Sequence, residues 1–280
     1  MSEMRFILII PFYNARNYLR ECLDSILMQS HRTWLAVCAD DHSEDGSSNL
    51  IPTDPRIIRR YNEQRVTALP NIYNAITRSG IEYDDHDVIC NLDGDDRLLE
   101  PRSLEIIADI YNRNPHCLLT YGQYVTSSGN PGHCKPYLPN EFKKLRQKSF
   151  RASHLRTFKW KLYKEFLHQD PQLLAYRDDK GSFFTMASDL AIMFPLMEIA
   201  GYPNIVVNEK PVYWYRLYER NDHIVDREKQ QNIDAEIRSK PIFIPTFLPI
   251  YYRVSTRLYS TTRQLYRWIK NGFLQKKDLK

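Results

Sequence analysis

The chain has 280 residues, with 39 Lys and Arg against 34 Asp and Glu, and 42% of its residues are hydrophobic. This composition excludes a wholly disordered chain, and the length favours one large α/β domain with a tail over two equal domains. The longest apolar stretch, residues 242–252, contains two prolines and is too short to span a bilayer. The N-terminus lacks the basic start expected of a signal peptide. Five cysteines form no Cys-x-x-Cys pair, so we expect a reduced, cytoplasmic setting rather than a disulfide framework.

The net charge of +5 is concentrated at one end of the chain. Residues 253–280 carry eight basic residues and one acidic residue, a net charge of +7. Residues 1–252 carry 31 basic and 33 acidic residues, a net charge of −2. The excess of positive charge is therefore a property of the C-terminal segment.

Apolar runs and helical periodicity alternate along the first half of the chain. Buried strands are predicted at residues 6–12, 34–39, 56–61, 87–92 and 117–125. Amphipathic helices are predicted between them at residues 19–27, 70–79 and 101–112. Strands that alternate with helices of this length predict a mostly parallel sheet covered on both faces.

Two acidic clusters follow two of the predicted strands. Residues 40–46 come after the second strand, and residues 93–96 come after the fourth. In open α/β sheets the carboxyl ends of the strands form the ligand-binding edge. A hard divalent cation would compensate the repulsion between carboxylates gathered there and would also neutralise phosphates. The alternative is that both clusters are ordinary Asp-rich turns.

Six segments, taken in order, resemble the family 2 inverting glycosyltransferases with the GT-A fold. They are residues 9–14, 23–27, 40–46, 92–96, 188–190 and 213–216, within a resemblance that covers roughly residues 4–225. The resemblance implies an α/β fold of the GT-A type, which is Rossmann-like with a mostly parallel central sheet flanked by helices. It also implies a catalytic domain over residues 1–240, followed by a basic C-terminal helical extension over residues 241–280.

The resemblance implies a nucleotide-sugar donor, most often a UDP-sugar. Pro11 and Tyr13 lie where the first strand ends and would flank the base, and Asp40 would accept the base N–H. Arg65 is a candidate contact for the pyrophosphate or the base, as are Asn71 and Asn74. Asp41 is expected to form a turn and Asp96 to lie behind the site.

A divalent metal, Mn²⁺ or Mg²⁺, is the implied cofactor. By the resemblance, Asp95 binds the metal directly, and Asp93 reaches the metal or the ribose. His223 is placed where a histidine completes the metal site in several members, and imidazole is an acceptable Mn²⁺ ligand. Gly94 between the two aspartates allows a tight turn beneath the ligand.

Inversion needs a general base across the sugar from the metal, and Asp189 is the candidate. It opens an apolar helix, so the alternative is an N-cap role, which Ser188 could also fill. The family has Glu before this Asp, whereas the chain has Ser188. His154, Arg156 and Trp160 fall in a region that lines the acceptor side in relatives, and Trp160 can equally be a packing residue.

The same residues argue against two other enzyme classes that bind phosphates at the end of a strand. A haloacid-dehalogenase phosphatase needs Thr or Val at the fourth position after its nucleophile, and the sequence after Asp93 does not have it. A nucleotidyltransferase needs a Gly-rich, basic loop after the first strand, and residues 11–14 do not form one. A non-catalytic nucleotide-sugar-binding protein of the same fold stays open as the alternative. The implied acceptor is a hydroxyl of a glycan, lipid-linked or protein-linked molecule, and the transferred sugar is not visible in the sequence.

The C-terminal segment is predicted to be an amphipathic helix. At 100° per residue, the apolar residues between 254 and 273 share an arc of about 140°, and the basic residues lie opposite. This pattern is typical of an interfacial helix on an anionic membrane. The alternative is a terminal helix docked on the catalytic domain. No nucleic-acid partner is expected, because the chain contains no reading module.

Overall fold

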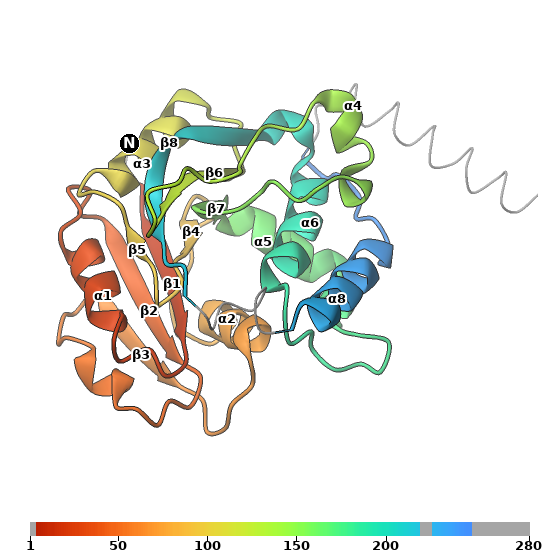
Figure 1. The fold of residues 1–280 in the computed structure, drawn as a ribbon. Helices are drawn as coiled ribbons and strands as arrows, with labels where there is room; N and C mark the ends of the chain where they lie inside the picture. The colour runs from red at the N-terminus through yellow and green to blue at the C-terminus, as the bar shows by residue number, and fades with distance from the viewer. Residues whose placement is uncertain (1–3, 219–225, 248–280) are drawn as a thin grey trace, which may run out of the picture.

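The computed structural model describes residues 4–218 and 226–247, which form one α/β unit around a single sheet (Figure 1). Eight described strands take the order β3-β2-β1-β4-β7-β6-β8-β5. The strands are β1 (Phe6–Phe12), β2 (Trp34–Asp40), β3 (Ile57–Tyr61), β4 (Val88–Asn91), β5 (Arg97–Leu98), β6 (Leu119–Thr126), β7 (Arg156–Lys159) and β8 (Ile205–Tyr215). The α/β fold predicted from the sequence is confirmed.

The half of the sheet formed by β3, β2, β1 and β4 is wholly parallel. All seven residues of β1 are buried, as expected for a central strand covered on both faces. In register, Phe12 at the end of β1 lies beside Asp40 at the end of β2. The carboxyl ends of these strands therefore meet at one edge, as the sequence predicts.

The other half of the sheet is mixed rather than parallel. β7 runs antiparallel to β4 and to β6, and β5 runs antiparallel to β8. In the β4–β7 pair, Asn91 lies opposite Arg156. Because β7 runs back along β4, its first residues lie beside the loop that follows β4, and the antiparallel pairing thus adds residues to that edge.

Helices cover both faces of the sheet. They are α1 (Leu19–Leu27), α2 (Ala68–Thr77), α3 (Ser103–Arg113), the single turn α4 (Pro139–Phe142), α5 (Trp160–Gln169), α6 (Ser188–Ala200) and α8 (Arg227–Ser239). In Figure 1, α1 and α3 lie on one side of the sheet, and α2, α5 and α6 lie on the other. None of the described helices is long and apolar enough to cross a membrane.

Helix α6 is the central helix on its side of the sheet. Every residue from Leu190 to Ala200 is buried, so the helix is covered on all faces and only its first turn is accessible. That first turn contains Asp189. The packing of α6 thus fixes the position of this acidic residue.

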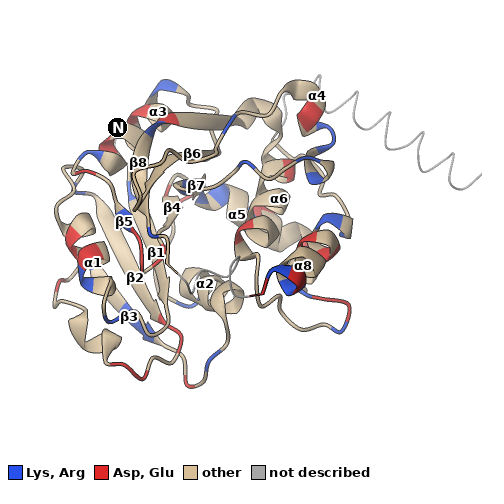
Figure 2. Ribbon diagram, viewed as in Figure 1, with Lys and Arg blue, Asp and Glu red and all other residues tan. Residues whose placement is uncertain are grey.

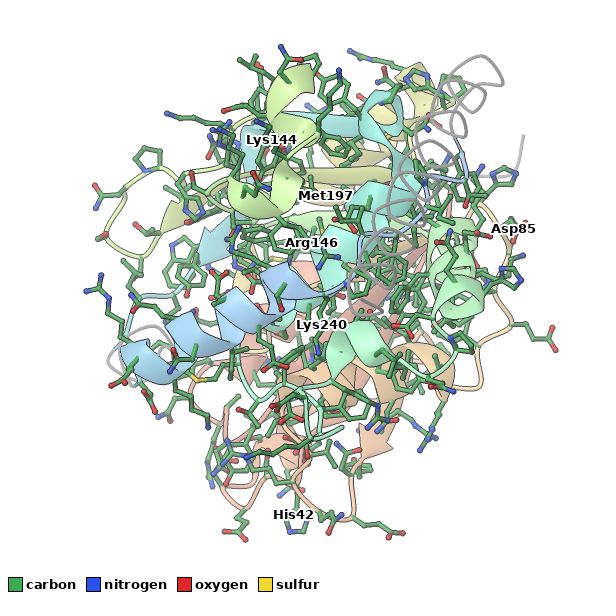
Figure 3. All side chains as sticks on the ribbon, turned by 90° about the vertical axis from the view of Figure 1, so that its right-hand side faces the viewer. His42, Asp85, Lys144, Arg146, Met197 and Lys240 are labelled. Atoms are coloured by element: carbon green, nitrogen blue, oxygen red, sulfur yellow. The ribbon has the colours of Figure 1, made fainter. Side chains whose placement is uncertain are left out.

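Helix α8 is linked to the rest of the fold through a buried arginine. Figure 3 shows Arg146 on the side of the molecule where α8 and α6 lie together. Its guanidinium donates to both carboxylate oxygens of Glu198 in α6, at 2.6 and 2.9 Å, and to the carbonyl of Ile237 in α8 at 2.7 Å. Acidic and basic residues mark the rest of α8 (Figure 2).

Residues 241–247 continue to pack on the same unit. The ring of Phe243 contacts that of Phe166 in α5, with ring centroids 5.7 Å apart, and Thr246 N donates to Ile199 O at 3.1 Å. The expected boundary at residue 240 therefore does not coincide with a break in packing. Residues 254–273, the predicted amphipathic helix, lie outside the described residues.

Candidate active site

A cavity of about 730 Å³ opens at the edge where β1, β2 and β4 end. Its walls come from the loops after these strands, from the start of β7, and from the first turn of α6. Of the predicted site residues, it brings together Pro11, Tyr13, Arg65, Asp93, Asp95 and Asp189. Asp40 is not in its wall, and His223 lies outside the described residues.

One end of the cavity is formed by an aromatic ring and a guanidinium. The guanidinium carbon of Arg65 lies 3.9 Å from the ring centroid of Tyr13, which is a cation–π contact. Tyr13 follows β1 directly, and Arg65 belongs to the loop before α2. Two flat groups at this end suit a planar base and a phosphate.

The two aspartates at the end of β2 have different surroundings. The Asp40 carboxylate is buried, accepts from Ser43 N at 2.8 Å and is bonded by the Ser48 hydroxyl, so it stabilises its own loop. Asp41 lines the cavity and accepts from Val66 N and Thr67 N, each at 2.8 Å. The structure thus places Asp41 and not Asp40 in the cavity wall, because successive side chains at a strand end point to opposite sides.

The loop after β4 is packed tightly against β1. Gly94 N donates to Pro11 O at 3.1 Å, and a Cβ placed on Gly94 would stand 2.7 Å from the Cβ of Phe12. A larger residue at position 94 would therefore push this loop away from β1. The glycine thus allows close approach to β1, where a tight turn was predicted, and it keeps Asp93 and Asp95 next to the end of β1.

Asp96 is buried beneath this loop and connects it to β8. Its carboxylate accepts from the Tyr213 hydroxyl at 2.6 Å and from Arg216 N at 2.7 Å. Burial, with Asp95 and Asp93 nearby, raises the pKa of Asp96 well above its usual value. Its expected place behind the site agrees with these contacts.

The Asp95 side chain faces the segment that follows β8. Its carboxylate accepts from the Tyr218 hydroxyl at 2.6 Å, and its carbonyl accepts from Arg216 Nε at 2.8 Å. Burial and the Asp95 charge together raise the pKa of Tyr218, so this hydroxyl stays protonated and donates. The segment after β8 thus closes over the acidic loop.

A group of metal-ligating side chains lies in the same cavity. Asp93, Asp96 and His154 each offer a ligand atom, and these atoms lie within 4.8 Å of one another. His154 is 7% exposed, its ring stacks on that of Tyr213 at 4.4 Å, and no described residue hydrogen-bonds its Nδ1. Burial and the nearby Arg156 and His133 charges hold its pKa well below the usual value, so the imidazole is neutral. Carboxylates suit Mn²⁺ and Mg²⁺ alike, and an imidazole beside them is acceptable to Mn²⁺.

Arg156 lies between the carboxylates of Asp93 and Asp189. Its Nη2 lies 3.5 Å from an oxygen of Asp93, and its Nη1 lies 3.6 Å from an oxygen of Asp189. Its pKa is raised although burial opposes the charge, because Asp93 and Asp189 favour it. A single guanidinium therefore faces both carboxylates.

Sequence reasoning missed several residues of the site. The sequence predicts only a turn at Asp41, and it predicts no catalytic or metal-binding role for His154, Arg156 or Tyr218. The resemblance already placed His154 and Arg156 on the acceptor side, which was the available signal. Trp160 stacks on Tyr83 with ring centroids 4.2 Å apart and does not line the cavity, which agrees with its reading as a packing residue.

The fold is that of solved GT-A glycosyltransferases. Staphylococcus aureus TarS (residues 1–349) in complex with UDP-GlcNAc matches with a TM-score of 0.52 and 15% identity, over 85% of this chain and 62% of that chain. The mannosyltransferase PcManGT from Pyrobaculum calidifontis, solved with GDP-Man and Mn²⁺, matches with a TM-score of 0.55 and 17% identity, over 86% and 66%. At these identities the likeness concerns the fold.

Glycosyl transferase family 2 matches residues 7–170, more than half of the sequence, and the chain belongs to this family. TuaG of Bacillus subtilis (strain 168), whose name places it in teichuronic acid biosynthesis, is 33% identical over 93 residues, 32% of this chain and 35% of TuaG. Glycosyltransferase GlyA of Streptococcus pneumoniae is 32% identical over 100 residues, 34% of this chain and 14% of GlyA. The matches thus span about a third or less of these relatives.

Proposed function

We propose that this glycosyltransferase moves a sugar from a UDP-sugar to a hydroxyl of a glycan, lipid-linked or protein-linked acceptor, with inversion at the anomeric carbon. The observation that carries the proposal is the arrangement of carboxylates in one cavity. Asp93 and Asp95 lie beside the end of β1, and Asp189 lies across the Arg156 guanidinium from Asp93. Inversion needs such an arrangement, because the acceptor attacks from the face opposite the leaving diphosphate.

The nucleotide would bind between the end of β1 and the loop before α2. Tyr13 and Arg65 offer a ring and a cation to the base and diphosphate, and Asp41 replaces Asp40 as the candidate acceptor for the base N–H. Asp41 already holds Val66 N and Thr67 N, so it also sets the position of the loop that carries Arg65. The UDP complex of TarS supports a uridine donor, whereas the GDP-Man complex of PcManGT makes GDP-mannose the donor to test beside it.

Asp93 and Asp95 would hold the metal, and His154 offers a ring nitrogen within 4.8 Å of the Asp93 carboxylate. A bound divalent cation would supply positive charge that stabilises the departing diphosphate. The protein's part is to hold these ligands, which Gly94 does through its contact with β1 and Tyr218 through its bond to Asp95.

Asp189 would accept the proton of the attacking hydroxyl. Its side chain is 32% exposed and belongs to the first turn of a helix that is otherwise buried. The N-cap position of α6 is Ala187, and Asp189 makes no side-chain cap bond there. A cap role therefore does not account for this carboxylate.

The first test of the proposal is metal-dependent UDP binding. UDP should bind at least about 10-fold more tightly with Mn²⁺ or Mg²⁺ than with EDTA in isothermal titration calorimetry, because the cation neutralises the diphosphate. Asp95→Ala should remove most of this difference. Equal affinity with and without metal would rule out the metal-assisted proposal.

The second test separates catalysis from binding. Asp189→Asn should keep UDP affinity and still fold but lower UDP release from the best donor by about 10²–10⁴-fold, because Asn cannot accept the proton. Near-normal release by this variant would remove Asp189 from the chemistry. A wild-type protein that binds UDP-sugars yet releases no UDP would instead favour the non-catalytic binding protein.

We also propose that residues 253–280 contact the cytoplasmic face of an anionic membrane. The support is their net charge of +7 and the separation of apolar from basic positions between residues 254 and 273. An acceptor linked to lipid would then lie within reach of the cavity.

A further inference from the structure

The Arg156 side chain has an unusual set of contacts for a buried arginine. It is 8% exposed, and its Nε has no hydrogen-bond partner among the described residues. Its two terminal nitrogens lie 3.5 and 3.6 Å from Asp93 and Asp189, which is longer than a hydrogen bond. By contrast, the equally buried Arg146 donates from Nε, Nη1 and Nη2 at 2.6 to 2.9 Å.

This contrast separates a structural arginine from one that faces a site. Leaving a buried donor unpaired is costly, and a guanidinium placed only for stability would saturate its N–H groups, as Arg146 does. Arg156 instead makes no close hydrogen bond to either of the two carboxylates, Asp93 and Asp189, that line the same cavity. Its contacts orient those carboxylates without occupying their oxygens with close hydrogen bonds.

Asp189 depends on Arg156 more than Asp93 does. Within residues 4–218 and 226–247, the ion pair with Arg156 is the contact that the structure gives the Asp189 carboxylate. Asp93 has a further partner, and its backbone N donates to the Tyr213 hydroxyl at 3.3 Å. A partly exposed carboxylate with one oriented contact is free to swing into solvent when that contact is lost.

We propose that Arg156 is a positioning residue: it holds the Asp189 carboxylate inside the cavity and sets its placement relative to Asp93. The inference rests on the proposed function in taking Asp189 as the base. It extends that function by giving the base an orienting partner on β7, since a catalytic base is usually oriented by a third group. Because β7 runs antiparallel beside β4, this partner comes from the same sheet edge as Asp93.

The test compares Arg156→Gln, Arg156→Lys, Asp189→Asn and the Arg156→Gln/Asp189→Asn double variant in the full chain. UDP release is measured with saturating Mn²⁺ and the UDP-sugar that wild type hydrolyses fastest, with water as acceptor. Arg156→Gln should lower kcat by about 10–100-fold and change KM for the donor less than about 3-fold, as expected when an interaction specific to the transition state is lost. The double variant should be no slower than Asp189→Asn, because Arg156 acts through Asp189.

Arg156→Lys protects the test against loss of folding. It keeps a positive charge, but one ammonium cannot replace a fork that faces two carboxylates, so kcat should still fall at least about 5-fold. The matched control is Arg146→Gln, which removes an equally buried arginine outside the cavity. It should lower the melting temperature and leave kcat per folded molecule unchanged.

Three results would overturn the proposal. Arg156→Lys with wild-type kcat would show that charge alone suffices. Multiplied losses in the double variant would show that Arg156 acts independently of Asp189. A change in donor KM with kcat unchanged would make Arg156 a donor-binding residue instead.

A thermal cycle on the same variants separates failure of this inference from failure of the proposed function. If Arg156 and Asp189 are coupled, the melting-temperature losses of the single variants should differ from additivity by about 2 °C or more in the double variant. A wild type without UDP release but with this coupling would refute the proposed function and keep the pairing. Additive losses would refute the positioning role in either case.

Discussion

At the scale of single residues, the structure separates side chains that are adjacent in sequence. Asp40 and Asp41 are both buried acids at the end of β2, yet one is used by its own loop and the other lines the cavity. The motif that contains them was visible in the sequence, but which of the two carboxylates faces the ligand depends on the twist of the strand end. This is why the acidic cluster could be predicted and the member of it that lines the cavity could not.

The two aspartates should respond differently to mutation. Asp41→Ala should weaken UDP binding by about 10-fold or more, because charge-assisted hydrogen bonds of about 1.5–3 kcal/mol each to Val66 N and Thr67 N are lost from the binding loop. Asp40→Ala should mainly lower the melting temperature. Calorimetric titration with UDP and thermal unfolding of both variants provide the comparison, and equal loss of UDP affinity in both would contradict these assignments.

At the scale of secondary-structure elements, prediction succeeded where the pattern is local. The strand β1 and the helix α1 have the predicted bounds, and β2, β3, β4, β6, α2 and α3 differ from the predicted bounds by two residues or fewer at each end. By contrast, β7 was not predicted. It has four residues and begins at Arg156, and such a short run carries no periodicity that separates a strand from a loop. The antiparallel pairing that brings Arg156 to the site is a long-range property.

Arg146 links α6 to α8, because its guanidinium pairs with Glu198 of α6 and donates to the carbonyl of Ile237 in α8. Arg146→Ala should lower the free energy of unfolding by about 3–5 kcal/mol, because it leaves the buried Glu198 carboxylate without its partner. UDP affinity of the folded protein should not change, because Arg146 does not line the cavity. Denaturant unfolding gives the first quantity and calorimetry the second. A loss below about 1 kcal/mol would show that α8 is held by its other contacts.

At the scale of the whole molecule, the fold and the family followed from the order of the motifs. Each motif alone is common, but residues 9–14, 40–46 and 92–96 lie at the ends of β1, β2 and β4, and these strands adjoin in the sheet. Donor sugar and acceptor did not follow, because they depend on loops whose positions are set by packing rather than by local sequence.

The C-terminal segment yields a prediction for the full chain. The full chain should sediment with anionic vesicles at low salt, because each Lys or Arg near the membrane surface contributes on the order of 1 kcal/mol to the free energy of binding. Removal of residues 253–280 should release the protein and leave UDP binding intact. Raised salt should weaken the association, because the attraction is screened over about 8 Å at physiological ionic strength. A truncated protein that unfolds would show that the segment belongs to the catalytic unit.

The five cysteines are free and buried in different parts of the fold. Their rates of reaction with a thiol reagent would therefore report local unfolding of those parts. Burial raises the pKa of the Cys38 thiol to about 12 and that of Cys117 and Cys134 to about 11, so at pH 8 almost none is the reactive thiolate. A thiol reagent added to the native protein can therefore modify them only as the surrounding structure opens. The order in which the five sites become labelled would rank the stability of the regions that contain them, without any engineered probe.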